Sequence, residues 1–160
     1  MEVLTVGHSD HPIEDFIALL RKHSVEALVD TRSKPFSARH PQFTKHVVSQ
    51  LLGEAGIRYY FLGDKLGGRP GDKSLYDEEG APDYDKIAGT ATYKEGIESL
   101  MELAKGDENV AIMCSEGDYK QCHRYLLVSR SLALLDVEVT HILRDGRLEE
   151  NPAPQLAMDV

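Results

Sequence analysis

Both cysteines of the chain lie within residues 109–135, close to acidic and basic groups that could act with them. Cys114 follows a short apolar run, and Cys122 comes eight residues later with His123 directly after it. A cysteine near a helix N-terminus has a lowered pKa and is a good nucleophile, which makes Cys114 a candidate nucleophile. Glu116 and His123 could transfer protons beside it. Cys114, Glu116 and His123 are therefore the candidate catalytic residues.

The segment around these residues has the pattern of a strand, a turn and a helix. Residues 110–113 are apolar, residues 114–120 are polar with one glycine, and residues 121–135 repeat apolar side chains at helical spacing. In a parallel α/β sheet such a turn lies at the carboxyl end of a strand, where ligands usually bind. Because Cys122 shares a helix face with Leu126, we expect it to pack in the core.

The same alternation of short apolar runs and amphipathic segments extends along the chain. Expected strands are residues 2–6, 25–29, 57–62, 110–113 and 137–143, and expected helices are residues 12–23, 44–55, 84–88, 92–105 and 121–135. This order predicts an open, mainly parallel five-stranded α/β sheet with helices on both faces, which Rossmann-like and flavodoxin-like strand orders both fit. We expect residues 1–160 to form a single α/β domain, with the segment after Gly146 docked loosely.

Parallel strands bring the polar residues that follow them to one edge of the sheet. The candidate ligand-binding residues at this edge are His8, Ser9, Asp30, Arg32, Arg39, Gly67, Gly68 and Arg124. Arginines bind phosphate or carboxylate groups through paired hydrogen bonds, histidines transfer protons, and glycines let the backbone approach a ligand closely. These residue types favour thiol or acid–base chemistry on a small anionic or nucleotide-like ligand, in an enzyme or a ligand-binding protein.

Three other interpretations compete with this one. The loop of residues 34–40 is basic and could bind nucleic acid or nucleotides. A metal site is the second, with its ligands at Cys114, Glu116, Cys122 and His123, although this spacing matches no standard metal motif. The third is a partner-binding module with a buried ionic cluster. For Arg124 itself, a structural role is the alternative to ligand binding: it could pair with Asp30 or Glu116 and tie a helix to the sheet. No motif identifies a cofactor.

The composition and the net charge limit the partners and the cellular location that we expect for this protein. The chain has 160 residues, 28% of them charged, and a net charge of −9, which disfavours non-specific contact with nucleic-acid backbones. No apolar run approaches the roughly 20 residues that span a bilayer, and the first residues lack a signal-peptide pattern. We therefore expect a cytoplasmic protein with no membrane contact and with both cysteines reduced.

A set of short motifs, taken in order, resembles a known family of prokaryotic proteins. The motifs are Val6-Gly7-His8-Ser9, Leu28 to Arg32, Pro35 to Phe43, Leu66-Gly67-Gly68, Met113 to Glu116 and Cys122-His123-Arg124. As a set they are similar to the family named domain of unknown function 488, from about Val3 to Ile142. The resemblance implies a compact cytoplasmic α/β domain and assigns it no activity.

The turn after Cys114 also partly resembles the C-x-x-G-x-R loop of rhodanese-like sulfurtransferases. Tyr119 stands where that loop has arginine, and Glu116 and Asp118 would repel an anion held by the backbone N–H groups of such a loop. We therefore do not expect this turn to cradle an anion by itself.

Overall fold

A six-stranded sheet forms the centre of the computed structural model, which describes residues 1–152. The strands lie in the order β3-β2-β4-β1-β5-β6. Their bounds are β1 Glu2–Gly7, β2 Ala27–Asp30, β3 Arg58–Phe61, β4 Val110–Cys114, β5 Glu138–Ile142 and β6 Leu148–Glu150. Strands β1 to β5 run parallel, whereas β6 runs antiparallel to β5. The turns that follow the parallel strands therefore share one edge of the sheet.

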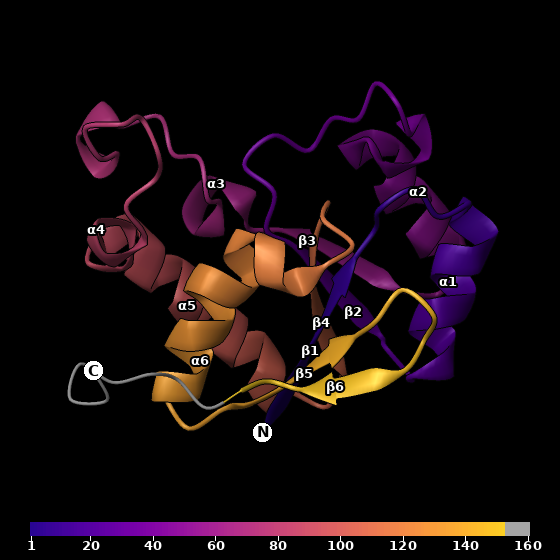
Figure 1. Cartoon of the computed structure of the whole chain (residues 1–160). Helices are drawn as coiled ribbons and strands as arrows, with labels where there is room; N and C mark the ends of the chain where they lie inside the picture. Colours follow the sequence, from indigo (N-terminus) through magenta and orange to yellow (C-terminus); the bar gives the residue numbers. More distant parts are fainter. Residues whose placement is uncertain (153–160) are drawn as a thin grey trace.

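Helices cover both faces of this sheet (Figure 1). One face carries α1 (Ile13–Lys22) and α2 (Lys45–Glu54), and the other carries α4 (Tyr84–Ala88), α5 (Ala91–Lys105) and α6 (Arg130–Leu134). The short α3 (Gly63–Leu66) follows β3, and a π-helical segment, η4 (Arg124–Ser129), leads into α6. The 3-10 turns are η1 (Pro41–Phe43), η2 (Lys73–Leu75) and η3 (Tyr119–Gln121). None of the helices in residues 1–152 has the length and apolar character that a membrane crossing requires.

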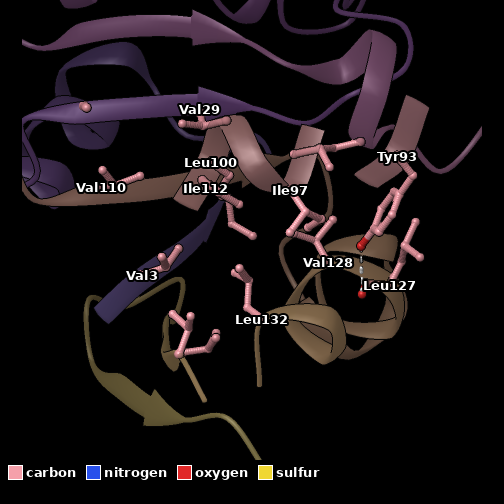
Figure 2. Close-up of a cluster of buried hydrophobic side chains, with 14 of the residues drawn as sticks. Val3, Val29, Tyr93, Ile97, Leu100, Val110, Ile112, Leu127, Val128 and Leu132 are labelled. Atoms are coloured by element: carbon pink, nitrogen blue, oxygen red, sulfur yellow. Dashed lines mark hydrogen bonds between the residues drawn. The ribbon is translucent and has the colours of Figure 1, made fainter. Parts of the chain in front are cut away.

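Side chains alternate between the two faces along each central strand, and they form two apolar clusters. Figure 2 shows the cluster between the sheet and helices α5, η4 and α6, with Val3, Val29, Ile97, Leu100, Val110, Ile112, Leu127, Val128 and Leu132. The cluster under α1 and α2 includes Phe16, Leu20, Leu28, Leu52 and Met113. Because both faces are buried, the central strands appear in the sequence as continuous apolar runs rather than as alternating ones.

The connections between the strands open a crevice at the carboxyl end of β4. Strand β4 lies between β1 and β2, and the helix after β4 covers the opposite face from the helices after β1 and β2. Ligands bind in such crevices in open α/β sheets. The loops around the crevice touch through their backbones, because a Cβ atom on Gly7 would lie 1.8 Å from the carbonyl oxygen of Glu116.

The open α/β architecture expected from the sequence is confirmed, with differences in detail. A sixth strand, β6, occupies part of the segment predicted to dock loosely, and the rest of that segment, from residue 153, lies outside the described residues. The strand order is neither the Rossmann order 3-2-1-4-5-6 nor the flavodoxin order 2-1-3-4-5.

The predicted helix at residues 121–135 begins later than its apolar pattern indicates. The side chain of Asp118 accepts a hydrogen bond from the Lys120 N–H and caps η3, and Cys122 is extended, with φ −136° and ψ 167°. Within the helix, the Ser129 hydroxyl donates to the carbonyl oxygen of Arg124. Such a bond competes with the regular α-helical ladder, in a stretch that has π-helical geometry.

Candidate active site

A cavity of about 590 Å³ opens at the carboxyl ends of β1, β2 and β4. Its walls combine both cysteines with histidine, arginine and loop residues: His8, Arg32, Ser33, Lys34, Phe36, Ser37, Gly68, Arg69, Tyr84, Cys114, Ser115, Gln121, Cys122 and His123. Three of these residues are lysine or arginine and none is acidic, although the chain has a net charge of −9. The cavity therefore has a basic lining within an acidic protein.

The two cysteines form a hydrogen-bonded pair in the wall of the cavity. Cys114 ends β4 and is buried, Cys122 is partly exposed just before η4, and their Sγ atoms lie 2.8 Å apart. Burial raises the pKa of the Cys114 thiol well above its usual value, so Cys114 keeps its proton. The hydrogen bond from Cys114 lowers the pKa of Cys122 to about 7. Of the two thiols, Cys122 is therefore the more readily ionised one. It is partly exposed and lines the cavity, so the prediction that Cys122 packs in the core is wrong.

Arg124 lies beside this pair, and no carboxylate within residues 1–152 forms a salt bridge with it. Its side chain is fully buried, and Nη2 donates to the backbone carbonyl oxygens of Glu116 and Gly117 at 3.3 and 3.4 Å. Nε and Nη1 have no hydrogen-bond partner within residues 1–152. The structure thus corrects the interpretation in which Arg124 pairs with the carboxylate of Asp30 or of Glu116. The positive charge of Arg124 instead favours the thiolate form of Cys122.

Asp30 joins Arg32 to His8 at the ends of β1 and β2. Its carboxylate accepts hydrogen bonds from Nε and Nη2 of Arg32 at 2.9 and 2.8 Å, and a third from the hydroxyl of Tyr59. Nη1 of Arg32 lies 3.3 Å from Nε2 of His8, which we assign as the acceptor, because Nδ1 of His8 lies 2.9 Å from the carbonyl oxygen of Ser9 and donates to it. Burial lowers the pKa of His8 to about 4, so the ring is neutral at pH 7.

His123 borders the cavity from the start of the last helix. Its Nε2 lies 2.8 Å from the carbonyl oxygen of Thr31, so we assign the ring proton to Nε2, which leaves Nδ1 as a proton acceptor. Burial lowers the pKa of His123. Gly68 packs directly on the ring, since a Cβ atom at Gly68 would lie 2.8 Å from Cβ of His123. The loop after α3 and the last helix therefore meet at this histidine.

Several residues predicted for the site lie outside the cavity. Glu116 and Arg39 have exposed side chains, and neither of them lines it. The Oγ atom of Ser9 accepts a hydrogen bond from Arg144 at 2.9 Å, away from the cavity walls. Gly67 is buried against a neighbouring loop and also does not line the cavity. The structure therefore joins His8, Asp30 and Arg32 in one hydrogen-bonded network. It leaves the side chains of other candidate residues outside the cavity.

The four residues of the metal hypothesis do not converge on one point. Within residues 1–152 there is no group of three or more His, Cys, Asp or Glu side chains that could hold a metal ion. The side chain of Glu116 is exposed to solvent, and Nε2 of His123 is occupied by its hydrogen bond to the backbone. These two residues therefore do not join the cysteines in a metal site.

Other cavity residues are absent from the candidates found in the sequence. Lys34, Phe36 and Ser37 belong to the loop after β2, whose length and basic character mark it without selecting any of these side chains. Arg69 follows the glycines after α3, and Tyr84 begins α4. No sequence signal connects Tyr84 with the cavity, because its place depends on how the segment between β3 and β4 folds over the sheet.

The fold and the site define an open α/β domain with a thiol pair in a basic cavity at the strand ends. A family model described as domain of unknown function DUF488 matches residues 12–131. The chain belongs to this family, which confirms the resemblance of its sequence motifs. The matched residues include both cysteines, Arg32 and His123, whereas His8 precedes them. Comparisons with curated proteins and with solved structures gave no match.

Proposed function

We propose that the cavity binds a small anionic ligand and that the Cys122 thiolate attacks an electrophilic atom of that ligand. The observation that carries this proposal is the charge of the lining, which has three basic residues and no acidic one in a protein of net charge −9. A concave site lined by one sign of charge concentrates ligands of the opposite sign.

Two of the three cations are available to a ligand. Asp30 already balances Arg32 through a salt bridge of 2.8 Å. Lys34 and Arg69 line the cavity with exposed side chains and form no salt bridge with a described residue. An anionic group that enters between them exchanges water for two charge-assisted contacts.

The remaining wall suits a nucleophilic reaction. Cys114 forms a hydrogen bond with Cys122, and the buried guanidinium of Arg124 supplies a positive charge that favours the thiolate. His123 keeps Nδ1 as an acceptor for a proton that the ligand releases. Phe36, which is 70% exposed, and Tyr84 add aromatic surface to the same cavity. These rings favour a ligand with a flat apolar part, such as a nucleotide.

Alkylation with two reagents of equal size and different charge tests this proposal. Iodoacetate is an anion and iodoacetamide is neutral, so the basic cavity should raise the rate of Cys122 carboxymethylation relative to carbamidomethylation. We expect this rate ratio to exceed that of a free cysteine by about tenfold. Peptide mapping by mass spectrometry would measure the modification of Cys122 separately from that of Cys114.

Charge-removing variants make the test specific. Lys34→Gln and Arg69→Gln should each lower the iodoacetate preference, and inorganic phosphate should compete with iodoacetate in the wild-type protein. Lys105→Gln is the control, because it removes the same charge from an exposed position at the end of α5. A rate ratio equal to that of free cysteine, unchanged in all three variants, would show that the cavity does not recognise anions.

A further inference from the structure

The two cysteines lie much closer together than anion binding by the cavity requires. Cys114 and Cys122 come from different elements, the end of β4 and the residue before η4, yet their Sγ atoms lie 2.8 Å apart. A disulfide bond is about 2.05 Å long, so a relative shift of under about 1 Å would bring the two sulfur atoms to bonding distance. The hydrogen bonds of Cys114 in the sheet hold one partner in place.

The two sulfur atoms differ in the way that a redox pair requires. Both cysteines line the cavity, but Cys122 is partly exposed whereas Cys114 is buried. The hydrogen bond with Cys114, the charge of Arg124 and backbone N–H groups at the start of η4 lower the pKa of Cys122, which favours the thiolate, the form that reacts with oxidants. Cys114 retains its proton, and its Sγ lies within hydrogen-bond distance of Cys122 Sγ and of the carbonyl oxygen of Glu116. One thiol is thus placed for oxidation and the other is placed to resolve the product.

We propose that Cys114 and Cys122 are a reversible redox pair, in which a hydroperoxide oxidises Cys122 and Cys114 then closes a disulfide within the chain. This inference goes beyond the anion-binding proposal and does not depend on it. It assigns a modification site to the two cysteines and names its substrate by class, a small hydroperoxide.

The chemistry balances in two steps. The Cys122 thiolate attacks the terminal oxygen of hydrogen peroxide, the O–O bond breaks, and Cys122 becomes a sulfenic acid while hydroxide leaves and is protonated to water. The Cys114 sulfur then attacks the Cys122 sulfur, the S–O bond breaks, and the departing hydroxyl takes the Cys114 proton to form a second water. The two cysteines are oxidised by two electrons and the peroxide is reduced. A small dithiol such as dithiothreitol reverses the reaction by thiol–disulfide exchange.

Mass spectrometry of the intact chain tests the pair directly. The protein is treated with graded hydrogen peroxide and then with N-ethylmaleimide, with and without dithiothreitol between the two reagents. We expect the wild-type chain to lose two hydrogen atoms and both maleimide adducts together, to remain monomeric on a non-reducing gel, and to regain both adducts after dithiothreitol. We also expect oxidation at pH 7 to be about tenfold faster than for free cysteine, because more of Cys122 is thiolate.

Single variants separate the roles of the two cysteines. Cys114→Ser should stop at the sulfenic acid, which dimedone traps on Cys122, and Cys122→Ser should leave Cys114 slow to react. Circular dichroism would confirm that each variant is folded. The proposal is wrong if peroxide leaves both wild-type thiols free to react with maleimide, if the disulfide joins two chains, or if Cys122→Ser is oxidised as fast as the wild type. Both proposals use the Cys122 thiolate, but these measurements involve no anionic ligand. A failure of anion recognition therefore leaves the redox pair unaffected, and a Cys122 that prefers iodoacetate but forms no disulfide contradicts the redox pair alone.

Discussion

Asp30 stabilises the site by balancing a buried cation. Its carboxylate is fully buried and accepts two hydrogen bonds from the Arg32 side chain and one from Tyr59. A buried ion pair costs desolvation energy when it forms, but removal of one partner leaves the other charge unbalanced. The pair therefore holds Arg32 and, through it, His8 at the cavity wall.

The variant Asp30→Asn should lower the free energy of unfolding by about 3–5 kcal/mol, because it leaves the Arg32 guanidinium buried without a counter-charge. Tyr59→Phe is the matched control, since it removes one hydrogen bond to the same carboxylate and leaves the charges in place, at a cost of about 1 kcal/mol. Urea unfolding measures both. Equal losses in the two variants would mean that the charge of Asp30 contributes nothing beyond its hydrogen bonds.

The sequence predicted the positions of several candidate residues correctly and those of others wrongly. His8, Arg32, Cys114 and His123 line the cavity as predicted, because the ends of parallel strands must meet. Cys122 was assigned to the core from the helical spacing of residues 121–135, but the chain is still extended at this residue and the helix begins after it. An irregular turn has no repeating pattern, so the sequence does not show which way a side chain such as that of Glu116 points.

Among the elements, the loop after α3 is positioned by a close contact rather than by secondary structure. Gly68 lies on the His123 ring, with room for no Cβ atom: the nearest atoms, Cβ and Cγ of His123, would be 2.8 and 2.9 Å away. His123 is held on its other side by its hydrogen bond to Thr31. Any residue larger than glycine at position 68 must therefore push the histidine or the loop away.

Gly68→Ala should lower the free energy of unfolding by about 1–3 kcal/mol, as overpacking does. Gly71→Ala is the matched control in the same loop, because nothing lies within 4 Å of a Cβ atom there, and it should have little effect. Thermal unfolding compares the two. In Gly68→Ala, an NMR shift of the His123 ring resonances would locate the strain, and unchanged stability together with unchanged resonances would contradict this contact.

Apolar periodicity predicts well the elements that contribute side chains to the two apolar clusters. The five parallel strands and helices α1, α2, α4 and α5 were predicted within a few residues, because each carries a face that the core requires. Strand β6 has three residues, two of them glutamate, and only its pairing with β5 makes it a strand. The four-residue α3 is too short to show a period.

For the whole molecule, buried histidines make stability depend on pH, because burial lowers the pKa values of His8 and His141 and also those of His11 and His123. His8 and His141 are almost completely buried, and burial lowers the pKa of each to about 4 from the usual 6.5. The Nδ1 and Nε2 atoms of His141 bond to Thr5 and Asn151. The unfolded chain takes up protons on these rings as the pH falls below about 6.5, whereas the folded chain does so only near pH 4.

The free energy of unfolding should therefore be largest above about pH 6.5 and should fall between about pH 6.5 and pH 4, by up to about 3 kcal/mol for each histidine. Urea unfolding at a series of pH values measures this slope, and His141→Gln should flatten it. Hydrogen bonds lower the pKa values of Asp10, Asp72 and Asp145 below 3.8, so these carboxylates titrate outside the window. A constant free energy across the window would show that the two rings are not held neutral.

The position of β1 in the sheet also determines when the sheet can be completed. Both neighbours of β1 are made late, since β4 begins at Val110 and β5 at Glu138, whereas β1 begins at Glu2. During synthesis on the ribosome, the apolar residues of β1 and both of its edges stay unpaired until nearly all of the described chain has emerged. Such long-range pairing is slow and leaves strand edges open to aggregation. The sheet therefore cannot be completed before β5 is made, and chains that terminate before β5 expose the strand that the finished sheet covers on both sides.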